Sequence, residues 1–176
     1  MDSRSPFVVW LTGLSGSGKT TLAKKLHISL HRKGLPSVII DGDEVRRTIS
    51  RDLGFSKKDI QENHRRVRSL VKAHLAEGRI TIVSIISPHT RVRAAARKEF
   101  KNFVEIFCDC PISVCAQRDP KGHYRNVKKG ATENFIGIHS IYERPEHPEL
   151  VLHTNRETPA QSLRKIEDML KGKSLI

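Results

Sequence analysis

Eight residues near the start of the sequence have the types and spacing needed to hold a polyphosphate. Gly13, Leu14, Ser15, Gly16, Ser17, Gly18, Lys19 and Thr20 fit the pattern G-x-x-x-x-G-K-[ST] at every specified position. Glycines allow successive backbone N–H groups to turn toward one point at the positive end of a helix dipole. In such a loop the lysine reaches the β- and γ-phosphates, and the threonine hydroxyl is a ligand for Mg²⁺. We therefore predict a nucleoside triphosphate site with Lys19 catalytic, and we expect Lys19 to face solvent while the loop is empty.

Two carboxylates form a second set of candidate catalytic residues. Asp41 and Asp43 follow residues 37–40, a short apolar run that indicates a buried strand. Ligands of parallel α/β sheets bind outside the carboxyl ends of the strands, so this pair is expected beside the polyphosphate. There, either carboxylate could position an acceptor hydroxyl or hold metal-bound water. The alternative is that the pair serves as a helix cap, as Asp43 could.

The elements that must position these residues alternate between strands and helices. Apolar runs at residues 7–11, 37–40, 80–86, 103–108 and 149–154 predict five strands. Helical spacing predicts helices directly after the glycine loop, near 45–53, from about 57 to 77, and over 90–100, 111–118 and 160–171. Ser56 and Asp59 fit a capping box at the start of the longest one. This order predicts an α/β fold of three layers, a five-stranded parallel sheet with helices on both faces.

One segment departs from this pattern. Residues 119–148 are rich in charge, glycine and proline and show little periodicity. A loop this long in a compact domain is usually functional, so we expect a lid that closes over bound nucleotides. Arg118, Lys121 and Arg125 would then neutralise charge during phosphate transfer. The whole chain, residues 1–176, is expected to form a single domain.

The composition limits the partners. Thirty-two lysines and arginines against nineteen acidic residues give a net charge of +13, which indicates an anionic partner. With no dominant basic run and few aromatic residues for stacking on bases, a small polyanion is favoured over nucleic acid. No apolar run reaches the ~20 residues of a membrane span and no signal peptide is evident, so we expect a soluble, cytoplasmic protein without a membrane partner. Cys108, Cys110 and Cys115 are expected to be buried, reduced thiols rather than zinc ligands.

A phosphate-binding loop alone does not define a reaction, because motors, GTPases and kinases all carry one. The N-K-x-D signature that reads guanine is absent from the sequence. The small size and the basic lid favour an ATP-dependent kinase for a small acceptor, in which the lid excludes water. The alternative is a nucleotide-binding protein without catalysis. The intact Asp41-Gly42-Asp43 and the lid argue against that alternative, because a pure binder needs neither.

Eight motifs follow one another in register from Val8 to about Thr154. They are residues 13–21, Asp41-Gly42-Asp43, Asp52-Leu53-Gly54-Phe55-Ser56, Glu62-Asn63-x-Arg65-Arg66, Ile86-Ser87-Pro88, Arg118-Asp119-Pro120-Lys121-Gly122-x-Tyr124, Asn134-Phe135-x-Gly137-Ile138 and Tyr142-Glu143-x-Pro145. This succession resembles the adenylylsulfate kinase family. The resemblance implies a P-loop kinase fold and transfer of the ATP γ-phosphate to the 3′-hydroxyl of adenylylsulfate, in sulfate assimilation, with Mg²⁺.

The same resemblance implies roles for individual residues. The ATP site would comprise the loop from Gly13 through Thr21 together with Arg118, with Thr20 as the metal ligand. The acceptor site would be lined by Asp41, Arg46, Phe55, Asn63, Ile86, Ser87, Lys121, Asn134 and Phe135. The candidate catalytic residues are Lys19, Asp41, Asp43, Ser87 and Lys121. Ser87 matches a serine that the family assigns to a phosphorylated intermediate, although direct in-line transfer needs none. The expected partner is a small nucleotide acceptor, and a homodimer stays open.

Five residues depart from the family pattern, several of them in the region implied to bind the acceptor. Glu44 replaces Asn, Ile60 replaces Arg, His89 replaces Tyr, Ile136 replaces Thr and His139 replaces Asp. The lost arginine alone would forfeit a charge-assisted contact of about 1.5–3 kcal/mol. The sequence therefore leaves open a different acceptor, such as the cytidine diphosphate derivative cytidine diphosphoramidate, while the family motifs favour adenylylsulfate.

Overall fold

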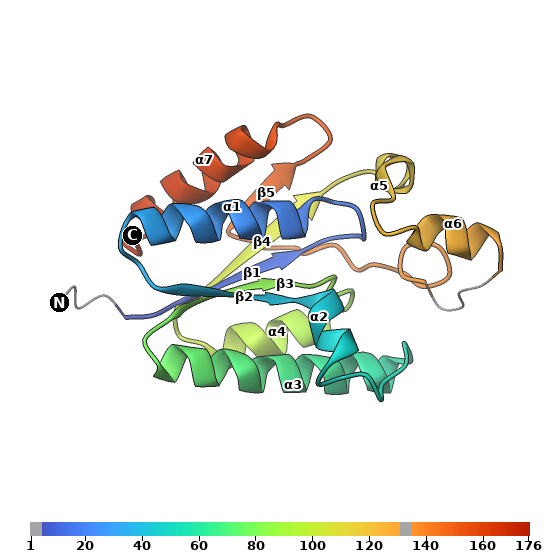
Figure 1. Cartoon of the computed structure of the whole chain (residues 1–176), viewed down its shortest axis with the longest axis horizontal. Helices are drawn as coiled ribbons and strands as arrows, with labels where there is room; N and C mark the ends of the chain where they lie inside the picture. The colour runs from blue at the N-terminus through green and yellow to red at the C-terminus, as the bar shows by residue number, and fades with distance from the viewer. Residues whose placement is uncertain (1–4, 131–134) are drawn as a thin grey trace.

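The chain folds around one parallel β-sheet. The computed structural model describes residues 5–130 and 135–176. Strands β1 (Val8–Thr12), β2 (Ser37–Asp41), β3 (Ile80–Ser84), β4 (Phe103–Asp109) and β5 (Leu150–His153) pair in the order β2-β3-β1-β4-β5, and every pairing is parallel (Figure 1). Because the strands run in one direction, their carboxyl ends meet at one edge of the sheet. The loops that follow β1, β2 and β3 therefore lie next to one another.

Helices cover both faces of this sheet. α1 (Lys19–Arg32) and α7 (Pro159–Gly172) lie on one face, and α3 (Lys57–Ala76) and α4 (Thr90–Glu99) lie on the other (Figure 1). Alternate side chains of β1 point to opposite faces of the sheet. Val9 and Leu11 pack with α1 and α7, whereas Val8 and Trp10 pack with α3 and α4. The short helices α2 (Gly42–Arg47), α5 (Ile112–Arg118) and α6 (His123–Lys128) lie toward the carboxyl ends of the strands. The predicted three-layer α/β fold is confirmed.

Most predicted elements are present, with differences at their ends. The helix predicted near residues 45–53 is α2, which already begins at Gly42, because the Asp41 side chain accepts a hydrogen bond from the Asp43 backbone N and caps it. The predicted capping box of Ser56 and Asp59 is present at the start of α3. β3 ends at Ser84 rather than at residue 86, since the chain turns into the wall of the site. Helix α6, inside the segment 119–148, was not predicted.

The three cysteines behave as the sequence indicated. Cys108, Cys110 and Cys115 are buried and free. Burial raises the pKa of the Cys108 thiol to about 12. Among residues 5–130 and 135–176, no helix combines the length and apolar character needed to cross a membrane.

Candidate active site

The phosphate-binding loop connects β1 to α1 at the carboxyl edge of the sheet. Gly13 has a φ angle of 146° and Gly16 one of 78°, in the range that favours glycine. A Cβ at Gly13 would lie 2.6 Å from the carbonyl oxygen of Cys108, and a Cβ at Gly16 would lie 2.8 Å from that of Cys115. Glycine at both positions is therefore what lets the loop pack against β4 and α5.

A cavity of about 950 Å³ opens over this loop. From the predicted ATP site, it is lined by Ser15, Gly16, Gly18, Lys19, Thr20, Thr21 and Arg118. Gly13, Leu14 and Ser17 do not line it: Ser17 is fully buried, and Leu14 packs into apolar clusters beside the cavity. These three residues lie on the side of the loop that faces away from the cavity, so any contact that they make with ATP would come from their backbone.

Lys19 is buried, and the expectation that it faces solvent was wrong. The residue is 8% exposed, and its Nζ donates hydrogen bonds to the carbonyl oxygens of Gly13 (2.9 Å) and Leu14 (2.8 Å). The loop itself thus offers the ammonium group two acceptors and draws it inward. Burial lowers the pKa of Lys19 to about 8. Because a bound polyphosphate favours the charged form, binding above pH 8 should take up a proton at Lys19.

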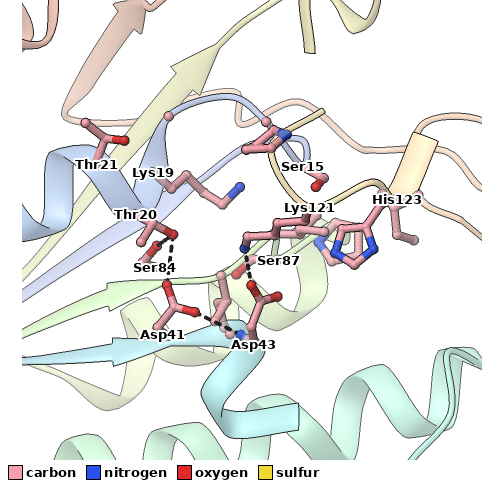
Figure 2. A pocket seen from close by; sticks show the side chains of 18 of the residues that line it. Ser15, Lys19, Thr20, Thr21, Asp41, Asp43, Ser84, Ser87, Lys121 and His123 are labelled. Atoms are coloured by element: carbon pink, nitrogen blue, oxygen red, sulfur yellow. Dashed lines mark hydrogen bonds and ion pairs between the residues drawn. The ribbon is translucent and has the colours of Figure 1, made fainter. Parts of the chain in front are cut away.

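Asp41 and Asp43 line the same cavity as the loop, beside the predicted polyphosphate site, as expected (Figure 2). The Thr20 hydroxyl donates to Asp41 Oδ2 at 2.8 Å and lies 3.4 Å from Ser84 Oγ. Asp41 Oδ1 accepts a hydrogen bond from the Asp43 backbone N at 3.0 Å, so Asp41 rather than Asp43 is the helix cap. Hydroxyl and carboxylate oxygens, the ligands that Mg²⁺ prefers, are thereby brought together at Thr20 and Asp41. The Asp43 carboxylate stays free of the cap.

A cation from the predicted lid meets Asp43 across the cavity. Lys121 Nζ forms an ion pair with Asp43 Oδ2 (Figure 2). Arg118 lies on the other side of the loop, where its Nη2 donates to the Thr154 carbonyl oxygen at 2.7 Å. Arg125 pairs with Asp119 at 3.5 Å and does not line the cavity. The expected role in charge neutralisation therefore fits Lys121 and Arg118 but not Arg125, which is turned toward its own helix start.

The remainder of the cavity is aromatic and polar. Phe55 is 53% exposed, and the guanidinium carbon of Arg46 lies 4.6 Å from the centre of its ring. Such an aromatic face suits the flat base of a nucleotide. Asn63 Oδ1 is buried and has no hydrogen-bond partner in the part of the chain that the structure describes. The predicted acceptor-site residues that line the cavity are Asp41, Arg46, Phe55, Asn63, Ile86, Ser87, Lys121 and Phe135. Asn134 lies outside the described residues.

The Ser87 hydroxyl already has two hydrogen-bond partners. It accepts a hydrogen bond from Trp10 Nε1 at 2.8 Å and lies 3.1 Å from His64 Nε2. His64 Nδ1 lies 2.7 Å from the Ile60 carbonyl oxygen, which can only accept, so Nδ1 carries the proton and Nε2 accepts from Ser87. The backbone of Ser87 has a φ angle of 50°, and its carbonyl oxygen accepts from Arg93 at 2.7 Å. These contacts suit a residue that positions the wall of the cavity.

His64 should make the stability of the protein sensitive to acid. Burial lowers the pKa of His64 from 6.5 to about 4. Between those values the unfolded chain binds a proton that the folded chain does not, so the free energy of unfolding should fall by about 3 kcal/mol as pH decreases through this range. We expect His64→Gln, whose amide oxygen can still accept from Ser87, to lose less stability between pH 7 and pH 4.5. Urea unfolding of both proteins at both pH values measures the difference, and equal losses would contradict the prediction.

The segment 119–148 is docked on the phosphate-binding loop and on α4. Tyr124 Oη donates to the Ser15 carbonyl oxygen at 2.8 Å. A Cβ at Gly137 would lie 2.9 Å from a methyl carbon of Leu14. Further along, Glu143 Oε2 accepts a hydrogen bond from the backbone N of Thr90, at the start of α4, at 2.6 Å. The segment therefore touches the loop directly, which is where a lid would sense bound nucleotide.

Only two of the five departures from the family pattern line the cavity. Ile60 and Ile136 do so, and they pack with Val92 in a small apolar cluster that joins α3, α4 and the segment 119–148. The other three do not line it. Glu44 is exposed on α2, His89 lies 3.2 Å from the carboxylate of Glu143, and His139 accepts from the Phe135 backbone N at 3.3 Å. Their positions outside the cavity weaken the case for a rebuilt acceptor site.

Several residues that line the cavity were not predicted from the sequence. They are Arg47, His64, Ser84, His123, Thr154, Glu157, Pro159 and Ser162, among others. Ser84 and Thr154 follow or end strands at the carboxyl edge, so the rule that found Asp41 could have found them. His64 gave no comparable signal, because a histidine one turn after Ile60 on a helix is unremarkable until its partners are known.

Known proteins of similar sequence and structure point to one family. A sequence model of the family described as adenylylsulphate kinase matches residues 5–153. The adenylyl-sulfate kinase of Clostridium kluyveri is 44% identical over 94% of this chain and 84% of its own length, and that of Pseudomonas aeruginosa is 42% identical over 97% and 88%. A solved structure of a Mycobacterium tuberculosis APS kinase in complex with AMPPNP and APS is 37% identical with a TM-score of 0.90, and covers 96% of this chain and 99% of that one. The chain belongs to the adenylylsulfate kinase family.

Proposed function

We propose that this kinase transfers the γ-phosphate of ATP to the 3′-hydroxyl of adenylylsulfate, which yields 3′-phosphoadenylylsulfate for sulfate assimilation. The observation that carries the proposal is the single cavity shared by the phosphate-binding loop and by the aromatic wall of Phe55 and Phe135, with Asp43 and Lys121 also facing it. The relatives named adenylyl-sulfate kinases support it, as does the M. tuberculosis structure that holds AMPPNP and APS.

On the donor side, Lys19 would exchange the carbonyl oxygens of Gly13 and Leu14 for the β- and γ-phosphate oxygens of ATP. Backbone N–H groups of the loop at the start of α1 would add fixed positive charge. Thr20 and Asp41 would hold Mg²⁺, which when bound neutralises phosphate charge. Arg118, already placed beside the loop by its bond to Thr154, would contact the remainder of the ATP.

On the acceptor side, Asp43 would orient the 3′-hydroxyl and accept its proton. Lys121 is paired with Asp43 and would move onto the transferred phosphoryl group, where charge develops. Ser87 would not carry phosphate, because its hydroxyl already donates to His64 and accepts from Trp10. We propose that Ser87 positions the loop after β3, whose Ile86 also lines the cavity.

The reaction can be tested directly with purified protein, ATP, MgCl₂ and adenylylsulfate. We expect ADP to form only when the acceptor is present, together with an equal amount of 3′-phosphoadenylylsulfate, detected by chromatography and mass. When MgCl₂ is left out and a chelator is added, neither product should form. ATP binding without ADP formation in the presence of adenylylsulfate would instead favour a nucleotide-binding protein without catalysis.

The segment 119–148 should become protected from protease when both nucleotides bind. Its contacts to Ser15 and Leu14 join it to the loop that ATP would occupy, so bound ligands should hold it in place. Limited proteolysis followed by mass analysis should show slower cleavage within 119–148 in the presence of AMPPNP and adenylylsulfate. Cleavage sites elsewhere serve as the internal control. A cleavage rate that is unchanged by both ligands would count against a lid.

We propose a single domain over residues 1–176 and a cytoplasmic location, where ATP is available, with no nucleic acid as a partner. A homodimer is also part of the proposal. Among the relatives, the APS kinase of Thiobacillus denitrificans, 30% identical, is described as hexameric. Size-exclusion chromatography with light scattering would measure the mass of the assembly that this chain forms.

A further inference from the structure

Five lysine and arginine side chains line the cavity, namely Lys19, Arg46, Arg47, Arg118 and Lys121. Four of them are engaged with strong acceptors. Lys19 and Arg118 donate to backbone carbonyl oxygens at the ATP loop, and Lys121 is paired with Asp43. Arg46 donates from Nη1 to the carbonyl oxygens of Leu53 (3.2 Å) and Gly54 (2.6 Å), and its guanidinium lies over Phe55. Each of these four cations would have to exchange a protein partner to bind an incoming anion, whereas the fifth has its terminal nitrogens uncommitted.

Arg47 is that fifth cation. It is the last residue of α2, one helical turn after Asp43, and it is exposed. Its one hydrogen bond runs from Nε to the Asp43 carbonyl oxygen at 3.3 Å, and within residues 5–130 and 135–176 it forms no ion pair. Both terminal guanidinium nitrogens are thus available as a planar fork, the geometry that binds two oxygens of a phosphate or sulfate group.

The fold places Arg47 at the acceptor end of the cavity. α2 follows β2, one edge strand of the sheet, and also carries Arg46, which lies over Phe55. Arg118 and Thr154 follow β4 and β5, toward the opposite edge. The loop that would hold the ATP phosphates lies between, after the central strand β1. Arg47 is therefore separated from the cations of the donor side.

We propose that Arg47 is a specificity-determining residue that binds the phosphosulfate group of the acceptor. This inference rests on the proposed function, in which the acceptor is adenylylsulfate, a nucleotide with negative charge on both its phosphate and its sulfate. Ile60 gives the cavity an apolar side chain packed against Ile136 and supplies no charge. The Arg47 guanidinium therefore binds the negatively charged oxygens of the acceptor, in addition to any contact that the partly engaged guanidinium of Arg46 makes.

The test compares Arg47→Gln with Arg47→Lys and with a matched control, Arg51→Gln. Arg51 is exposed, lies four residues further along and does not line the cavity, so its substitution removes the same charge without reaching the site. At saturating ATP, Arg47→Gln should raise the KM for adenylylsulfate at least about tenfold, the lower end expected for one charge-assisted contact. The KM for ATP should stay within about twofold. Arg47→Lys, which keeps the charge without the fork, should fall between, and Arg51→Gln should match the parent protein.

The outcomes separate this inference from the function on which it rests. If the parent protein does not phosphorylate adenylylsulfate, both are overturned. If the parent protein is active and the KM for adenylylsulfate is the same in Arg47→Gln and Arg51→Gln, only the role of Arg47 is overturned. A rise in both the ATP and adenylylsulfate KM values would place Arg47 in general attraction of anions rather than in acceptor recognition, and would also overturn the proposal. Melting curves should coincide for all variants, because neither arginine is buried.

Discussion

We expect the Lys19→Ala variant to transfer phosphate ~10³-fold more slowly than the parent protein, the loss typical of removing one cation that stabilises the transferring phosphoryl group. Lys19 is the cation held within the loop itself, with its Nζ on the carbonyl oxygens of Gly13 and Leu14. Alanine leaves those two oxygens without their donor and removes the charge that meets the β- and γ-phosphates. A coupled assay of ADP release at saturating substrates measures the loss in kcat.

The fold should survive this substitution, although Lys19 is buried. Burial lowers its pKa to about 8, which means that the charged ammonium is less favourable in the folded loop than in water. The loss of its two hydrogen bonds is therefore partly offset, because the cost of burying the charge is removed as well. Lys24→Ala, an exposed position on the same helix α1, is the matched control and should keep full activity. A Lys19→Ala protein with near-parent turnover and an unchanged melting temperature would remove the case for this loop as the catalytic phosphate site.

The parts of the site that the sequence predicted share a physical basis. The loop from Gly13 to Thr20 needs special backbone angles, which only a fixed glycine spacing provides, so it is visible as a local pattern. Asp41 and Asp43 follow a short apolar run, and the rule that ligands bind at the carboxyl ends of parallel strands places them. The three-layer order followed in the same way from alternating strand and helix patterns. Each of these predictions rests on residues close together in the sequence.

The parts that the sequence did not predict depend on contacts between distant residues. Ser87 is joined to Trp10, 77 residues away, and to His64, 23 residues away, and neither link leaves a local signal. The family resemblance suggested a phosphorylated Ser87, whereas its partners suit a positioning role. In the sequence, Ile60 and Ile136 are two separate departures from the family pattern. In the structure they belong to one apolar cluster with Val92. The burial of Lys19 likewise depends on where the loop carbonyls point, which spacing does not reveal.

The second large effect is expected at Asp43, where Asp43→Asn should lower kcat ~10²-fold or more while the KM for ATP changes little. The amide keeps the size of the side chain, and the cap of α2 is provided by Asp41, so the helix should form normally. What is lost is the carboxylate that orients the 3′-hydroxyl and takes its proton, a contribution of ~10²-fold or more for a positioned base. The ion pair with Lys121 is lost as well.

Glu44→Gln provides the matched control, because Glu44 is the next residue on α2, carries the same charge and does not line the cavity. Its activity should equal that of the parent protein.

The Asp43→Asn substitution has two opposing effects on the rate. Loss of the base should lower kcat, whereas an unpaired Lys121 is more available to the phosphoryl group and should raise it. The two effects are separated by Lys121→Ala in the Asp43→Asn background: if Asp43 acts only by holding Lys121, the double variant should be no slower than Lys121→Ala alone. If Asp43 is the base, the double variant should be slower by a further tenfold or more, and a single Asp43→Asn variant within about threefold of the parent kcat would exclude that role.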